Sequence, residues 1–258
     1  MRAGASVIGA AALALALPQT AGAQELVDMF NSAFSPAEVT VVAGDSVTWR
    51  NGDLVVHDVR GPGFNSGLIQ RFMGFTQRFD TPGTQAYVCG LHPGMAGQVD
   101  VLAAQLTTPR GTFFHGEPVL LRGRAAPNTT VTIVDGAGAT AGTATANSGG
   151  AFKATVRAEA SYRARTALGD SPAATLTVRP APAVKLHAVR GRLKVVTSRN
   201  AKGLTARFEQ RTSAGWRVFA KAKVGAAGRA TTKARPGKLR VTLRRGNAVL
   251  ATSNAVTV

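Results

Sequence analysis

The sequence predicts an all-β protein, and three observations support this fold class. First, 29 glycines and 12 prolines are spread along 258 residues, which is typical of short extended segments separated by turns. Second, few residues are aromatic, while valine, threonine and alanine are common. Third, several short segments alternate apolar and polar residues, which is the period of a half-buried strand. A chain of this length has room for two or three small domains.

The first 23 residues form a separate segment. Met1-Arg2 precedes an apolar run at 7–17, and Ala21-Gly22-Ala23 then matches the small-x-small pattern of a signal-peptidase site. We therefore predict a signal peptide over 1–23 and an exported protein that is extracellular, periplasmic or associated with the cell wall. A retained membrane anchor is the weaker alternative, because the run is shorter than the roughly 20 residues that span a bilayer. No later segment is long and apolar enough to span one.

Residues 24–104 are predicted to form a compact β domain. Its expected strands, several of them alternating, lie at 39–41, 47–49, 55–59, 75–79, 85–88 and 98–101. In the third of these, Val55, His57 and Val59 are expected to share one face. The last two strands are joined by the segment that holds the only cysteine of the chain.

That segment carries three metal-binding side chains in a short loop. Cys89, His92 and Met95 follow one another at C-x2-H-x2-M spacing, and His57 lies 32 residues before the cysteine. A thiolate and two imidazoles in a trigonal plane, with a weak thioether on the axis, suit both Cu(I) and Cu(II). The short gaps let one tight loop aim its three side chains at one point, while His57 arrives from elsewhere. These four residues predict a type 1 copper site.

Three other interpretations of Cys89 agree less well with the sequence. A single cysteine is often a small buried hydrophobe, but in an oxidising compartment an unpaired thiol is at risk unless a metal occupies it. Structural zinc usually needs several cysteines or paired C-x2-C spacing, which one cysteine cannot supply. A Cys/His nucleophile needs an orienting Asn or Asp, and its histidine does not normally lie three residues away.

A longer series of residues in the same region matches a known family. The series is Phe34-x-Pro36, Val39-Thr40-Val41, Gly44-Asp45-x-Val47-x-Trp49, Asn51, His57, Phe79, Gly83, Tyr87-x-Cys89-x-x-His92-Pro93-x-Met95-x-Gly97-x-Val99-x-Val101. Over about 80 residues it resembles the cupredoxins of the plastocyanin and amicyanin group. The resemblance implies a Greek-key β-sandwich with one mononuclear type 1 copper, held by His57, Cys89, His92 and Met95. Such a site shuttles single electrons with a redox partner protein.

Details of the loop refine this resemblance. The short span from Cys89 to Met95 resembles that of amicyanin rather than the longer one of plastocyanin. The exposed edge of His92 is the expected electron port. Two neighbours depart from the family: Asp58 stands where Asn is typical, and Gly90 stands where Ser or Thr is typical. In the family those side chains tie the strands around the metal together, so we expect a looser site or a shifted reduction potential.

The rest of the chain is predicted to form two immunoglobulin-like β-sandwiches, at 105–181 and 182–258. The expected strands are short and separated by turns, at 118–121, 131–133, 152–156, 175–178, 193–196, 205–209, 216–220, 239–243 and 248–252. They resemble the Ig-like modules of many bacterial surface and secreted proteins. A short linker is expected around Arg179-Pro180-Ala181-Pro182.

Charge is distributed very unevenly along the chain. Residues 24–104 have 4 basic and 8 acidic side chains, while 105–180 have 8 basic and 4 acidic. Residues 181–258 have 18 basic side chains and 1 acidic one, a net charge of +17. This is more than solubility needs, so we expect the last domain to attract anionic envelope polymers or lipids. No nucleic-acid recognition motif accompanies the charge.

Three functions remain open on the sequence alone. The first is a blue copper electron carrier whose C-terminal β modules serve for spacing or envelope attachment. The second is a copper-binding protein for buffering or delivery, and the third is an adhesive or structural protein whose copper domain is not redox-active. An oxidase with a trinuclear cluster would need many histidines, and the chain has 4. We therefore expect a protein that is not an enzyme.

Overall fold

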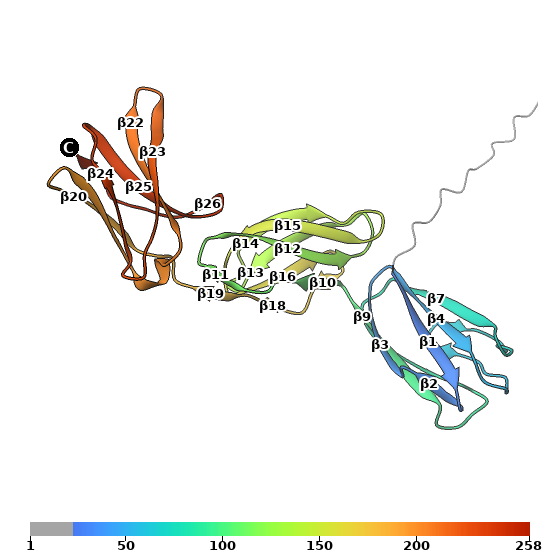
Figure 1. The fold of residues 1–258 in the computed structure, drawn as a ribbon. Coiled ribbons are helices and arrows are strands. Elements are labelled where there is room, and N and C mark those ends of the chain that lie inside the picture. Colours follow the sequence, from blue (N-terminus) through green and yellow to red (C-terminus); the bar gives the residue numbers. More distant parts are fainter. Residues whose placement is uncertain (1–22) are drawn as a thin grey trace, which may run out of the picture.

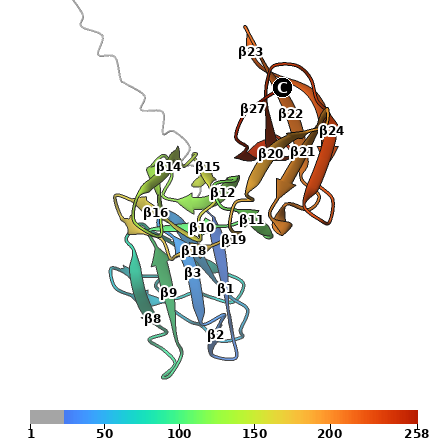
Figure 2. The same ribbon diagram turned by 90° about the vertical axis from the view of Figure 1, so that its left-hand side faces the viewer.

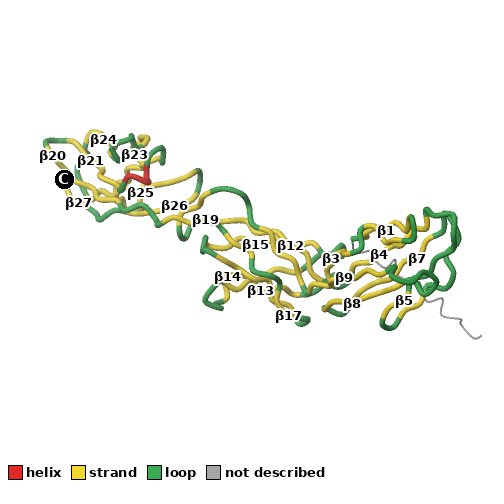
Figure 3. The backbone as a smooth tube through the Cα atoms, turned by 90° about the horizontal axis from the view of Figure 1, so that it is seen from below, coloured by secondary structure: helices red, strands yellow, loops and turns green. Residues whose placement is uncertain are grey.

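The computed structural model describes residues 23–258, whose regular secondary structure is almost entirely β-strand (Figure 1). The helical element of this range is a single 3-10 turn, Arg199–Ala201, drawn as the short red segment of Figure 3. The predicted signal peptide therefore lies outside the described residues, except for Ala23. The predicted all-β fold class is confirmed.

Two sheets build the first β-sandwich, which comprises β1 to β9. One sheet has the order β2-β1-β4-β7, formed by Ala33–Ser35, Gln24–Phe30, Asp45–Asn51 and Gly74–Phe79. The other has the order β3-β9-β8-β5-β6, formed by Glu38–Val42, Ala96–Leu102, Gly83–Val88, Arg60–Gly61 and Phe64–Asn65. β1 pairs with β4 and β3 with β9 in parallel, while the other pairs are antiparallel. These crossovers between the sheets place the loops before β5 and before β9 at one end of the sandwich.

An aromatic cluster fills the space between these two sheets. The indole of Trp49 is fully buried, with the ring centroid of Tyr87 at 5.1 Å and those of Phe64 and Phe75 at 5.9 and 6.0 Å. Burial raises the pKa of the Tyr87 hydroxyl. Cys89 and Met95 belong to the same buried cluster. The loop that carries them is therefore anchored on a close-packed core.

One predicted strand of this region is wrong. Val55, His57 and Val59 do not lie on a strand: His57 makes a single isolated bridge with Ile69, and Val55 is 46% exposed. The segment 55–59 is held by hydrogen bonds from the Asn51 side chain instead of by backbone pairing with a neighbouring strand. The strands expected at 39–41, 47–49, 75–79, 85–88 and 98–101 fall within β3, β4, β7, β8 and β9.

Strands β10 to β19 form a middle module. One sheet joins β10 (Ala104–Thr107), β12 (Pro118–Ala125) and β15 (Ala151–Arg157). A second has the order β14-β13-β16-β17, formed by Thr140–Thr145, Thr130–Asp135, Ser161–Thr166 and Gly169–Asp170, with β18 (Ala174–Thr175) also paired to β16. β11 (Thr112–Phe114) pairs in parallel with β19 (Thr177–Arg179).

Strands β20 to β27 form a last module, again with two sheets. The smaller sheet has the order β20-β21-β24, formed by Val184–Val189, Arg192–Thr197 and Arg229–Lys233. The larger has the order β23-β22-β25-β26, formed by Gly215–Lys223, Thr205–Thr212, Lys238–Arg245 and Ala248–Thr252, with β27 (Val256–Thr257) paired to β25. Each module has its own buried cluster.

Specific contacts join the three groups of strands, and the middle module lies between the other two (Figures 1 and 2). Arg124 of β12 reaches back to the first sandwich, where its two terminal nitrogens lie 2.7 and 3.0 Å from the carboxylate oxygens of Asp45. Phe114 of β11 is fully buried in the core of the last module. The domain limits at 104/105 and 181/182 stay predictions, since Ala104 belongs to the middle core and Phe114 to the last one.

Residues 23–258 contain no helix that is long and apolar enough to cross a membrane.

Candidate metal centre

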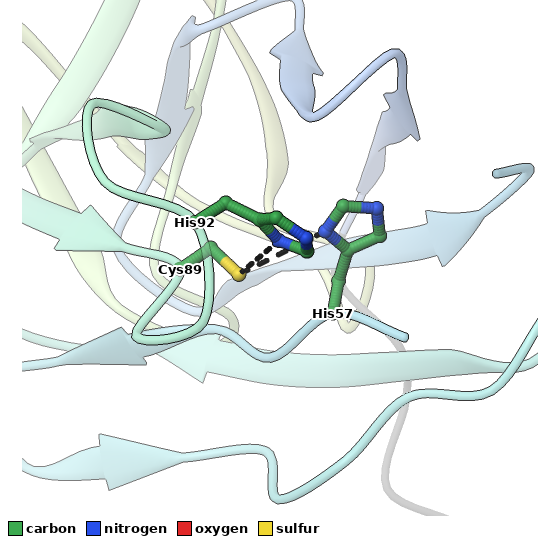
Figure 4. A group of neighbouring side chains, drawn as sticks. All are labelled: His57, Cys89 and His92. Carbon is green, nitrogen blue, oxygen red and sulfur yellow. Dashed lines mark hydrogen bonds between the residues drawn. The ribbon is translucent and has the colours of Figure 1, made fainter. Parts of the chain in front are cut away.

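Three of the four predicted ligands meet at the end of the first sandwich. The Sγ atom of Cys89 lies 3.4 Å from Nδ1 of His92 and 3.8 Å from Nδ1 of His57 (Figure 4). One candidate ligand atom from each of the three residues lies within 4.8 Å of the other two. His57 and Cys89 are buried, whereas His92 is partly exposed. The site is thus a cluster of one sulfur and two nitrogens that is buried at His57 and Cys89 and partly exposed at His92.

The loop that carries Cys89 and His92 is closed by its own backbone. The N–H of Cys89 donates to the carbonyl of Met95 over 2.9 Å, and the N–H of Met95 donates to the carbonyl of His92 over 3.2 Å. Gly94 has a φ of +85°, a conformation that glycine adopts without strain. Met95, the fourth predicted ligand, is therefore folded back beside Cys89, and its side chain is buried in the same cluster.

His57 is positioned by hydrogen bonds rather than by a sheet. Its backbone exchanges bonds of 3.3 and 2.8 Å with Ile69. The fully buried Asn51 donates from Nδ2 to the carbonyls of Val55 and Ile69, at 2.8 and 2.9 Å, and its Oδ1 accepts from the N–H of Asp53 at 2.8 Å. One amide therefore joins the segments before and after the histidine and holds the backbone around it.

Asp53 completes the surroundings of His57. Its Oδ2 atom lies 3.3 Å from Nε2 of His57, so that nitrogen carries the proton and Nδ1 presents a lone pair toward Cys89. The backbone N–H of Ser32, and then that of Leu54, lower the pKa of Asp53 against the opposing effect of burial. Nothing in the sequence singled out Asp53, because its role depends on a loop conformation.

The other two histidines lie away from this site. His115 pairs with Glu159 at 2.8 Å, and His187 is exposed on β20. Within residues 23–258, His57, Cys89 and His92 form the one cluster of His, Cys, Asp and Glu with metal-binding geometry.

Comparisons with known proteins place this site in a family. The chain is 32% identical over 103 residues to amicyanin-alpha of Methylorubrum extorquens, covering 37% of this chain and 86% of that protein. It is 34% identical over 113 residues to chloroplastic plastocyanin of Tetradesmus obliquus, covering 38% of this chain and 78% of that protein. The chain belongs to the cupredoxins. The predicted resemblance is therefore confirmed for this part of the chain.

Solved structures similar to this cupredoxin include mutants of amicyanin. An oxidized mutant is 26% identical, with 30% of this chain and 80% of that chain covered and a TM-score of 0.29. A reduced Cu(I) mutant at pH 4 is 28% identical, with 31% and 84% covered and a TM-score of 0.30. No protein-family model matches the chain.

Asp58 and Gly90, the two departures from the family pattern, contact each other in this cupredoxin. Oδ1 of the buried Asp58 accepts the N–H of Gly90 at 2.6 Å, which ties the His57 segment to the Cys89 loop. Oδ2 accepts from Nε and a terminal nitrogen of Arg60, both at 2.6 Å. A Cβ on Gly90 would lie 2.7 Å from the Arg60 guanidinium carbon. Arg60 thus occupies the space that a side chain at position 90 would fill. We expected a looser connection between the His57 segment and the Cys89 loop, but the Asp58–Arg60 ion pair and the hydrogen bond from the Gly90 N–H to Asp58 connect them.

Proposed function

We propose that this cupredoxin is a single-electron carrier whose copper ligands are His57, Cys89, His92 and Met95. The cofactor is one mononuclear type 1 copper ion, and the donor set fits it. The observation that carries the proposal is the convergence of Cys89 Sγ on two imidazole Nδ1 atoms at 3.4 and 3.8 Å. When bound, copper supplies a one-electron couple between Cu(I) and Cu(II).

The protein's part is to keep the ligands in place while the charge changes. Cys89 is anchored to the Trp49 core and closed against Met95, while His57 is held by Asn51 and Asp53. Ligands held in this way move little between oxidation states, which favours fast electron transfer. Burial of His57 and Cys89 limits access of water to the thiolate.

The partly exposed ring of His92 is the proposed electron port. Leu91, Pro93 and Gly94 around it are exposed and carry no charge, so a partner can approach without desolvating ions. The partner is proposed only as a redox protein. Electron carriers of this family are not enzymes as a rule, and we propose the same for this chain.

We further propose that the chain is exported and that the middle and last modules serve for spacing and envelope attachment. The proposal is supported by the signal-peptide pattern at 1–23 and by the net charge of the last module. The copper loop precedes β9 and the middle module follows it, so the port faces away from the rest of the chain.

A copper titration tests the proposed ligands. Apo-protein titrated with Cu(II) is expected to develop an intense visible thiolate-to-copper band that saturates at about one copper per chain. Cys89→Ser should abolish this band. His187→Gln, which changes an exposed histidine of β20, should leave it unchanged. A band that survives in Cys89→Ser, or a colourless wild-type protein with copper bound, would contradict the ligand assignment.

A further inference from the structure

One face of the last module carries positive charges that no residue of the module neutralises. In the sheet β20-β21-β24, Leu186, Leu193, Val195 and Ala230 point into the core. The alternate residues therefore point outward. Their cationic members, together with one histidine, define what we call the basic face: Lys185, His187, Arg192, Lys194, Arg229 and Lys233.

The register of the strands sets two of these positive charges directly opposite each other. Arg192 of β21 pairs directly with Lys233 of β24, and Lys194 of β21 pairs directly with His187 of β20. Side chains opposite each other on antiparallel strands have Cβ atoms about 5 Å apart, and like charges there are destabilising. We therefore expect the protein to be less stable than the same sheet with neutral residues at Arg192 and Lys233.

No acidic group relieves this repulsion. The one acidic residue of 181–258 is Glu209, which is buried on the other sheet. Its carboxylate accepts from Arg240 at 2.7 Å and from Thr242 at 3.1 Å. Among the residues that the structure describes, no ion pair involves any member of the basic face.

We propose that the basic face binds a linear phosphodiester polymer. The inference rests on the proposed attachment role of the last module and names the chemistry that it recognises. Outward side chains repeat about every 7 Å along a strand and about every 5 Å between strands. Guanidinium and ammonium groups at this spacing can each take a phosphate of a flexible chain, with strong charge-assisted hydrogen bonds.

Two other anionic surfaces fit the face less well. Duplex DNA is stiff, with a persistence length of about 50 nm, so its phosphates cannot follow the twisted surface of a sheet. Membrane surfaces favour amphipathic elements that insert large apolar side chains, whereas the apolar members of this face are Val189 and Val196, with no aromatic residue. A single flexible polymer can follow the twisted sheet and needs no inserted apolar side chain.

The test compares two sets of three substitutions in the full chain, with equal loss of charge. The face variant is Arg192→Gln, Lys194→Gln and Lys233→Gln. The control variant is Arg217→Gln, Lys221→Gln and Lys223→Gln, all exposed on β23 of the other sheet. Binding to immobilised poly(glycerol phosphate) is measured over a range of salt concentrations.

The face variant is expected to bind at least about tenfold more weakly and to show a salt dependence shallower by about three in slope, one for each lost contact. The control variant should change affinity by less than about twofold. Equal weakening of the two variants would mean that net charge alone attracts the polymer and would overturn the proposal.

At low salt the face variant should unfold at the same or a higher temperature than wild type, which excludes misfolding as the cause of weaker binding. A lower unfolding temperature would contradict the repulsion between the charges of the basic face.

Two further arms identify the ligand and separate this proposal from the copper function. Vesicles of phosphatidylglycerol and a duplex DNA should each bind more weakly than the polymer; tighter binding to either would overturn the assignment. Cys89→Ser should bind the polymer as wild type does, since the basic face lies in another module. The polymer-binding experiment therefore tests the basic face independently of the copper titration, which tests the proposed copper ligands.

Discussion

At the scale of single residues, the contact most particular to this chain is the Asp58 carboxylate beneath the Cys89 loop. It lies next to the ligand His57, is almost fully buried, and bonds both the Gly90 N–H and the Arg60 side chain at 2.6 Å. A buried carboxylate near a metal favours the more positive oxidation state, and the guanidinium of Arg60 opposes that effect. The reduction potential therefore depends on this pair.

Removing the positive member of the pair should lower the potential. In Arg60→Gln the negative charge of Asp58 is no longer balanced, so Cu(II) is favoured and the potential should fall on the order of 50 mV. Voltammetry of the copper-loaded protein measures this. The control is Arg78→Gln on β7, which removes the same charge from an exposed pair with Asp80. A potential that rises, or that falls equally in the control, would contradict the role of Arg60.

Some residues of the metal site could be predicted from the sequence and others could not. Cys89, His92 and Met95 were found because their spacing is local and lies in one tight loop. Asp53 and Arg60 were not found, because their contacts arise from loop conformations and from the space left by Gly90. Sequence spacing gives the side chains that can bind a metal, but not those that orient or neutralise them.

At the scale of elements, the segment between β4 and β5 behaves differently from its sequence pattern. Val55, His57 and Val59 alternate as a strand does, yet the Asn51 side chain bonds the backbone carbonyl of Val55 and shares that of Ile69 with the His57 N–H. Alternation alone cannot show this, since the competing donor is a side chain. Other strands passed unnoticed because their sequences are weakly apolar, such as β14, which reads TAGTAT.

Replacing this amide should loosen the histidine segment. Asn51→Ala removes the side-chain donor to the Val55 carbonyl, one of the two donors to the Ile69 carbonyl, and the acceptor of the Asp53 N–H, which should lower the free energy of unfolding by about 2 kcal/mol. Because His57 loses its positioning, copper affinity should fall as well. Urea unfolding of apo-protein and copper competition titrations measure the two effects. Asn65→Ala, at an exposed amide of β6, is the control. Unchanged copper affinity in Asn51→Ala would contradict the positioning role.

At the scale of the whole molecule, two junctions hold the groups of strands together. Asp45 and Arg124 form a bidentate pair between the first sandwich and the middle module. At the second junction, the guanidinium carbons of Arg179 and Arg245 lie 3.9 and 4.7 Å from the centroid of the buried Phe114 ring. Arg245 also bonds Glu117 at 3.1 Å. The sequence predicted a simple linker near Arg179, but Phe114, about 65 residues earlier, packs across the same junction.

Phe114 should therefore control how the last module is held. Phe114→Ala removes a fully buried ring from the core of the last module, which should lower its stability by about 3 kcal/mol. The angle between the modules should also vary more widely, which small-angle X-ray scattering detects as a broader distribution of maximum dimensions. Phe113→Ala, which affects the middle core, should not broaden that distribution. Equal scattering from both variants would contradict a junction built on Phe114.

The central proposal is that His57, Cys89, His92 and Met95 hold copper for single-electron transfer rather than for storage. Cyclic voltammetry of the copper-loaded full chain tests it most directly. A rigid ligand set predicts a reversible one-electron wave whose peak separation stays near the one-electron limit of about 59 mV at moderate scan rates. Bound copper that gives no wave, or that is released on reduction, would contradict electron transfer and leave copper buffering or delivery as the function.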